Sequence, residues 1–255
     1  MIRKEGTARM ELSRARFYRV VTEAAEEEQR RGGIGTYREK KLHLILKNCC
    51  EEDPACQEVP TAGFIADIRR GDEITEIETA GFSGLCPKLA AYLPDYRVRL
   101  VHPLAGKKYV SWIDPETAEI SPRRLSPKKE SAYDLLFELV RILPFVRDPG
   151  LRVFGPVLEV EEYRLADGWG RGGKRGSHRY ERIPVDLCGI IELTTDDDYR
   201  RFIPDSLPDA FTVRAFSEAA RIGERKARAV MKVMERRGVL VPLGKAGRAM
   251  LWGRA

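Results

Sequence analysis

The sequence predicts an α/β fold with a smaller basic module near its C-terminal end. Between residues 34 and 103 the spacing of apolar residues changes from that of a helix to that of three short strands, and then back to a helix and a further strand. Hydrophobic residues make up 43% of the 255 residues, which is enough to build a core. The formal net charge is +6, and its positive excess gathers near the C-terminus.

Two helices are expected first. Residues 11–31 carry strong helix formers and are followed by Gly32-Gly33, a common way for a helix to end. A second helix is expected to begin near Thr36. Glu39 lies three residues after this threonine, which fits the reciprocal capping pattern of a helix N-terminus.

Short strands with one intervening helix are expected next. The four strands are expected at residues 57–60, 63–69, 73–79 and 97–102. The sequence Arg70-Gly71-Asp72 suits a tight turn that pairs the second strand with the third. Between the third and fourth strands, residues 83–93 have apolar positions at helical spacing.

The remaining elements are less regular. We expect a hairpin over residues 108–121, an amphipathic helix at 131–143 and strand character at 153–163. Residues 167–182 form a Gly-rich basic segment, expected either as a plain surface loop or as a nucleic-acid contact with stacking aromatic residues. The predicted divisions are an N-terminal helix, an α/β domain, a connecting region and a C-terminal module, at residues 1–33, 34–145, 146–208 and 209–255.

Three acidic residues form the most informative group in the α/β domain. Alternation along a strand places Glu76 and Glu78 on one face, and the turn at Gly71 can bring Asp67 beside Glu76. Carboxylates that converge on one point repel each other unless a cation lies among them, and Mg²⁺ or Mn²⁺ suits such oxygen ligands. The alternative is that these acids form the solvated face of a sheet.

The order helix, three-stranded meander, helix, strand, with these acids on it, resembles the PD-(D/E)XK nuclease superfamily over about residues 34–103. The resemblance implies metal-dependent hydrolysis of phosphodiester bonds. By the family pattern, Asp67 and Glu76 would hold the metal ion with the carbonyl of Ile77, and Glu78 would orient water. Glu39 on the helix matches a further family carboxylate.

Glu78 departs from the family pattern, because a lysine is usual at that position. Lys40 and Lys41, next to Glu39, are candidates to replace it. The sequence therefore leaves two functions open: an active nuclease, or a DNA-binding protein of regulatory type whose nuclease-like core is catalytically inactive. A protein-interaction adaptor is a third class.

The C-terminal segment has a separate signature. Residues 210–255 hold eleven basic and three acidic residues, a net charge of +8 that leaves −2 for the rest of the chain. Helices are expected at 211–220 and 224–237, followed by two strands around residues 244–247. This order resembles a winged helix-turn-helix.

By that resemblance the second helix would recognise nucleic acid, with DNA favoured over RNA. The residues expected to contact it are Arg225, Lys226, Arg228 and Lys232 on the helix and Lys245 and Arg248 on the wing. Such contacts should make binding strongly dependent on salt. The alternative is a small helical module that docks on protein.

Other features set bounds on the function. No apolar run has the length of a signal peptide or a membrane span, so we expect a cytoplasmic protein that does not enter a membrane. The five cysteines are an odd number without a CxxC pair, which favours free thiols over disulfides, with a zinc site as the minor alternative. The sequence leaves a homodimer open.

Overall fold

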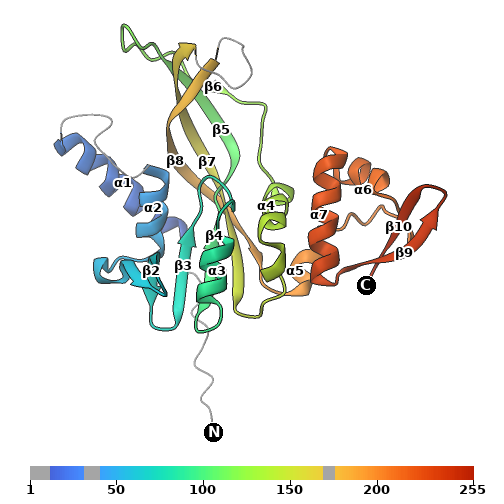
Figure 1. Cartoon of the computed structure of the whole chain (residues 1–255). Coiled ribbons are helices and arrows are strands. Elements are labelled where there is room, and N and C mark those ends of the chain that lie inside the picture. Colours follow the sequence, from blue (N-terminus) through green and yellow to red (C-terminus); the bar gives the residue numbers. More distant parts are fainter. Residues whose placement is uncertain (1–11, 32–40, 169–175) are drawn as a thin grey trace.

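A computed structural model describes residues 12–31, 41–168 and 176–255 of the chain (Figure 1). The predicted α/β class is confirmed, because helices pack on both faces of a mixed sheet. The sheet contains parallel and antiparallel pairs, in the order β1, β2, β3, β4, β7, β5 and β6, and β8 adds to β7. None of the described helices is long and apolar enough to cross a membrane.

The first part of the sheet follows the predicted order. Its elements are β1 (Gln57–Thr61), β2 (Phe64–Arg70), β3 (Glu73–Ile77), α3 (Cys86–Tyr92) and β4 (Arg97–Val101). Gly71 turns β2 into β3 with a φ of 61°, a conformation that glycine adopts at little cost. Helix α3 then carries the chain across the sheet, so that β4 pairs parallel to β3.

Two long strands build the other half of the sheet. They are β7 (Leu151–Gly168) and β8 (Gly176–Leu193), which pair antiparallel along their length. The first part of β7 lies parallel to β4, and its later part lies parallel to β5 (Leu104–Ile113). The short β6 (Arg124–Leu125) pairs with the other edge of β5.

The region predicted as a connecting segment, 146–208, therefore contains the two longest strands. Of the predicted Gly-rich loop at 167–182, residues 176–182 belong to β8, and 169–175 lie outside the described residues. Glycine and charged residues are poor strand formers in isolation, so the pairing with β7 makes this segment a strand. The strand character predicted at 153–163 is confirmed.

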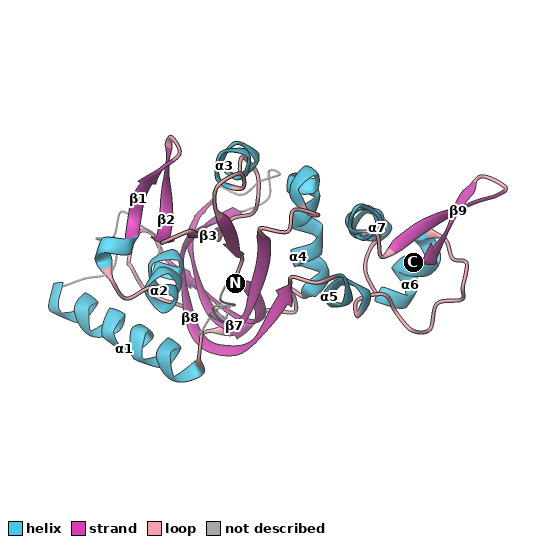
Figure 2. Cartoon of the chain, turned by 90° about the horizontal axis from the view of Figure 1, so that it is seen from below, coloured by secondary structure: helices cyan, strands magenta, loops and turns pink. Residues whose placement is uncertain are grey.

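Helices cover both faces of the sheet (Figure 2). On one face, α1 (Arg14–Arg31) and α2 (Lys41–Cys50) bury a cluster with side chains of β7 and β8. On the other face lie α3, α4 (Ala132–Glu138) and the 3₁₀ helix η2 (Leu139–Phe145). The single helix predicted at 131–143 is thus an α-helix that continues as a 3₁₀ helix, with a kink at Ile142.

The C-terminal segment forms two helices and a hairpin, as expected. Its elements are α6 (Val213–Ala220), α7 (Glu224–Arg237), β9 (Leu240–Ala246) and β10 (Ala249–Arg254), and the short helix α5 (Asp196–Arg200) precedes the segment. Thr212 caps α6 by accepting the N–H of Ala215, and Gly238 ends α7 with a φ of 87°. Helix α7 packs on α4 and η2, so the segment extends from that side of the sheet (Figure 1).

The five cysteines are free thiols. Burial raises the pKa values of Cys49 and Cys50 to about 12, although the charge of Arg99 opposes the shift at Cys50. Both thiols therefore stay protonated near neutral pH, which makes them weak nucleophiles and weak metal ligands.

Candidate functional site

Strands β2 and β3 separate where Asp67 and Glu76 lie. Their last ladder pair joins Ile68 and Thr75, so Ile77 lies beyond the paired part of β2 and β3. Oδ2 of Asp67 accepts the N–H of Ile77 at 2.7 Å and lies 3.1 Å from Nε2 of His43 on α2. Burial would raise the pKa of Asp67, but the bonds from His43 and Ile77 outweigh it and lower the pKa. Asp67 is therefore ionised near neutral pH.

Glu76 is the most buried of the three acids. Its exposed fraction is 1%, and Oε2 accepts a hydrogen bond from Nζ of Lys88 on α3 at 2.7 Å. Oε1 is buried and has no hydrogen-bond partner among the described residues. Burial, and next the charge of Asp67, raise the pKa of Glu76 to about 7, although Lys88 opposes the shift. The buried hydroxyl of Tyr92 also lacks a partner at hydrogen-bond distance among the described residues, and burial, and next the charge of Glu76, raise its pKa, so this hydroxyl and an ion are alternative partners for the carboxylate.

Glu78 follows the end of β3 and lies beside the same group. Its N–H donates to the carbonyl of Val101 at 2.9 Å, and its own carbonyl lies 2.6 Å from Nδ1 of His102. Burial, and next the charge of Asp67, raise the pKa of Glu78 to about 6. The structure therefore brings the three acids of the predicted site together, and it holds the backbone of Glu78 firmly.

The donor set meets part of the needs of the implied metal ion. Glu39, the fourth predicted acid, lies outside the described residues. Within the described ranges, no group of three or more His, Cys, Asp or Glu side chains is arranged to hold a metal ion. Mg²⁺ commonly takes only one or two carboxylates from a protein and completes its shell with water and substrate phosphate. Asp67 and Glu76, with the unpaired Oε1, fit an ion bound in that way.

The exposed face of α7 carries a basic stripe. We use this name for Arg225, Arg228, Lys232 and Arg236, which are all exposed. Their spacing of three, four and four residues places them along one line of the helix. The buried residues of α7, which include Ala227, lie on the opposite face of this helix. Three of the four residues were predicted as nucleic-acid contacts, and Arg236 was missed.

Lys226 lies off this stripe. Its Nζ donates to Oδ1 of Asp134 on α4 at 2.5 Å, so it joins α7 to the rest of the molecule. Lys245 and Arg248 are exposed at the far end of the β9–β10 hairpin, where a wing would contact a nucleic-acid backbone. Five of the six predicted contacts are therefore exposed, and the sixth, Lys226, holds α7 against α4.

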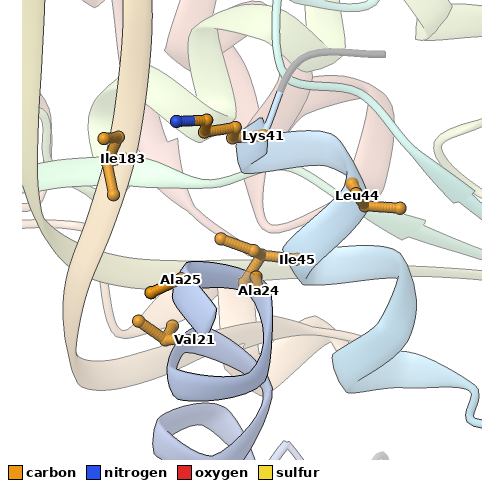
Figure 3. Close-up of a pocket in the computed structure, with 7 residues that line it drawn as sticks. All are labelled: Val21, Ala24, Ala25, Lys41, Leu44, Ile45 and Ile183. Carbon is orange, nitrogen blue, oxygen red and sulfur yellow. The ribbon is translucent and has the colours of Figure 1, made fainter. Parts of the chain in front are cut away.

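An apolar pocket of about 110 Å³ lies between α1, α2 and β8 (Figure 3). Its lining residues are Val21, Ala24, Ala25, Lys41, Leu44, Ile45 and Ile183. The lining contains no carboxylate, thiol or hydroxyl group. Lys41 is its single charged residue, and this residue also has an interaction in the structure. Lys41 is therefore the one ionisable group that the pocket offers.

Comparison with known proteins assigns most of the sheet to one family. The family described as "Domain of unknown function (DUF8091)" matches residues 40–194, which is more than half of the chain. The chain belongs to the DUF8091 family. The matched region runs from the start of α2 to the end of β8, so it includes Asp67, Glu76 and Glu78 but neither α6 nor α7.

A protein of another organism is similar over most of the chain. An uncharacterized protein of Treponema pallidum (strain Nichols) is 25% identical over 227 residues, which covers 86% of this chain and 86% of that protein. No solved structure matches the chain. The similarity to the Treponema protein extends beyond the length of the DUF8091 region, so it also takes in part of the chain outside that region.

Two residues of the DUF8091 region were not predicted as part of the site. His43 lies one residue beyond the buried Leu42, and Lys88 lies one residue before the buried Leu89. A signal for Lys88 is present in the sequence, because it is the basic residue of a helix that crosses from β3 to β4. The lysines expected to replace the family residue were those next to Glu39, so the cation that α3 supplies was not predicted.

Proposed function

We propose that this protein is a divalent-metal-dependent nuclease that hydrolyses phosphodiester bonds, with DNA favoured over RNA as its substrate. The observation that carries the proposal is the convergence of Asp67, Glu76 and Glu78 with Lys88 where β2 and β3 separate. The order α2, β1, β2, β3, α3 and β4 supports a nuclease-like core. Two buried acids with raised pKa values are typical of a functional site.

Each side chain has a role that its surroundings support. Asp67 and Glu76 would hold Mg²⁺ or Mn²⁺, which when bound polarises the phosphodiester and acidifies an attacking water. Glu78, with a pKa of about 6, is suited to accept the proton of that water near neutral pH. Lys88 supplies positive charge for the phosphoryl oxygens, in place of the lysine that Glu78 replaces.

The C-terminal segment would deliver this site to its substrate. We propose that α6, α7 and the β9–β10 hairpin act as a winged helix-turn-helix, with α7 toward the nucleic acid. The basic stripe supports this role, because its four exposed cations can neutralise phosphate charges. A cytoplasmic location and a homodimer belong to the same proposal.

The first experiment measures cleavage of single- and double-stranded DNA and RNA by the purified protein with Mg²⁺ or Mn²⁺. We expect cleavage to fall at least about a hundredfold in Asp67→Asn, in Glu76→Gln and in Lys88→Met, because electrostatic groups at a reacting centre typically contribute that much. Binding should survive in each variant. Asp72→Asn is the matched control, since Asp72 is exposed on the same hairpin and pairs with Arg97, away from the three acids.

A second candidate function is a nucleic-acid-binding protein with a catalytically inactive core. The ion pair between Glu76 and Lys88 favours it, because that pair already neutralises one carboxylate without a metal ion. Salt-sensitive binding without cleavage of any nucleic acid by the wild type would establish this function and exclude the nuclease. If neither cleavage nor salt-sensitive binding occurs, both functions are wrong and a protein-interaction adaptor is left.

A further inference from the structure

Four cationic side chains surround one buried carboxylate on the sheet. We name this group the Glu162 cluster, and it consists of Lys108, Glu162, Arg164, Arg179 and Arg182. The side chain of Glu162 on β7 has no exposed surface. Its Oε1 lies 2.6 Å from Arg164, and its Oε2 lies 3.1 Å from Arg182 and 3.6 Å from each of Lys108 and Arg179.

One carboxylate does not balance four cations. Burial would raise the pKa of Glu162, but Arg164, Lys108 and Arg182 outweigh it and lower the pKa to about 2, so Glu162 stays ionised. Two other acids face the cluster: Glu130, whose charge acts on Arg179, and Glu181, which accepts the backbone N–H of Arg182. The cluster still has more positive than negative groups when both are included.

Arg182 has a buried donor that its neighbours leave unused. Its side chain is only 8% exposed, yet its buried Nε has no hydrogen-bond partner in the described part of the chain. An arginine cannot lose its proton to relieve such burial, so the group needs an anion or acceptor. Burial, and next the charge of Arg182, also lower the pKa of Arg179.

The cluster opens into a small pocket beside the proposed active site. The pocket is lined by Leu42, Thr79, Ala80, Arg179, Tyr180, Glu181 and Arg182. Thr79 follows Glu78 directly, and Leu42 precedes His43, which contacts Asp67. The charge of Arg182 also acts on His102, whose Nδ1 lies 2.6 Å from the carbonyl of Glu78, so the cluster and the proposed active site share a neighbour.

We propose that Arg179 and Arg182, supported by Lys108, bind a phosphate of the polynucleotide next to the bond that is cleaved. The planar guanidinium group suits this ligand, because it can donate two parallel hydrogen bonds to phosphate oxygens. Tyr180 is 40% exposed at the edge of the pocket and can stack on a base. The choice of a polynucleotide as the source of the phosphate rests on the proposed function.

The test measures the affinity of a short labelled DNA oligonucleotide in EDTA, where metal-dependent cleavage cannot occur. Arg179→Gln is the main variant, since its side chain is 45% exposed and its replacement should leave the fold intact. We expect its affinity to fall about tenfold, as is usual when a hydrogen bond to a charged group is removed. The slope of affinity against salt should also fall by the equivalent of about one phosphate.

Arg123→Gln is the matched control, because Arg123 is 59% exposed and pairs with Glu161, the neighbour of Glu162 on β7. Its affinity should change less than about twofold, in the range of surface charges that do not touch the ligand. Equal affinity in the wild type and Arg179→Gln would overturn the proposal. An equal decrease of affinity in Arg179→Gln and Arg123→Gln would also overturn it, because the DNA would then respond to the overall positive charge and not to a specific site.

A further arm separates the sources of phosphate. Inorganic phosphate is titrated into the wild type and Arg179→Gln, and the melting temperature is measured. If phosphate stabilises only the wild type while the oligonucleotide binds both equally, the site takes a free phosphate and the polynucleotide assignment is wrong. A decrease of oligonucleotide affinity in Arg179→Gln supports it.

The proposal and the proposed nuclease can fail independently. Asp67→Asn should lose cleavage but keep its oligonucleotide affinity in EDTA, whereas Arg179→Gln should lose affinity even if the wild type cleaves nothing. Arg182→Lys is a second variant in case Arg179→Gln does not fold, because lysine keeps the charge beside Glu162 but lacks the forked donor. If Arg182→Lys melts at the temperature of the wild type and binds the oligonucleotide with the same affinity, the proposal is also contradicted.

Discussion

Glu76 combines burial with incomplete pairing. A carboxylate that leaves water loses solvation, and one hydrogen bond from Lys88 to Oε2 returns only part of it. The nearby charge of Asp67 adds repulsion, so Glu76 holds its proton up to a pH of about 7. This burial and repulsion make the folded state less stable at neutral pH. They would also favour a cation bound at Glu76, or a role for Glu76 in proton transfer.

The stability of the protein should depend on pH through Glu76. The pKa of Glu76 rises from 4.5 to about 7 on folding, so the folded state binds more protons than the unfolded state between these values. The free energy of unfolding should therefore fall as pH rises through this window, by at most about 3 kcal/mol at 1.36 kcal/mol for each pH unit. Glu76→Gln lacks this titration, so its stability relative to the wild type should increase from pH 5 to pH 8.

Urea unfolding at several pH values provides the measurement. A stability difference between wild type and Glu76→Gln that is constant from pH 5 to pH 8 would contradict the raised pKa. Asp72→Asn is again the control. Asp72 is exposed and Arg97 lowers the pKa of its carboxyl, so this variant should show no change of relative stability between pH 5 and pH 8.

The sequence could identify the acids of the site but not all of its cations. Alternation along the strand predicted at 73–79 places Glu76 and Glu78 on one face, and a tight turn places Asp67 near them, although β3 itself ends at Ile77. Which helix then approaches depends on packing across the sheet, where sequence spacing gives no direct information. For this reason the sequence shows Lys88 as the basic residue of a helix, but the structure is needed to place it beside Glu76.

At the scale of elements, β8 and α7 illustrate opposite cases. The apolar positions of α7 recur at helical spacing, so its bounds and its buried face could be predicted from the sequence. The start of β8, residues 176–182, lacks the apolar alternation of a strand, and it forms because β7 offers a long edge for pairing. Long-range pairing of this kind does not appear in a local pattern.

The prediction for α7 separates its exposed cations from its docking cation. Replacing Arg225, Arg228 and Lys232 together by glutamine should reduce the slope of log affinity against log salt by about 0.9 for each phosphate that the helix no longer neutralises. Lys226→Gln should keep the slope, because Lys226 pairs with Asp134 on α4. It should instead lower stability by at most about 1 kcal/mol, as expected for a partly exposed ion pair.

Binding titrations of labelled duplex DNA at several salt concentrations give both slopes. An unchanged slope in the triple variant would show that the stripe is only a solvated face. A reduced slope in Lys226→Gln would show that its ion pair opens to contact DNA.

At the scale of the whole molecule, the C-terminal module and the sheet share one hydrophobic core. Phe216 of α6 and Val230 of α7 belong to the same buried cluster as Leu135 of α4 and Leu100 of β4. Arg237 adds hydrogen bonds from α7 to backbone carbonyls outside the C-terminal segment. The boundary predicted near residue 209 thus follows a change in charge and sequence pattern, while the apolar packing continues across it.

This continuity predicts cooperative unfolding. Phe216 is fully buried and its ring lies edge-on to Tyr133 on α4, so Phe216→Ala should destabilise the protein by about 3–5 kcal/mol. Hydrogen exchange should report the same decrease of protection for amides of α7 and for amides of β3 and β4, because one core supports both. If only residues 209–255 lose protection, the module unfolds alone and is a separate domain. Tyr18→Ala is the control, since Tyr18 is 44% exposed on α1 and lies outside this cluster.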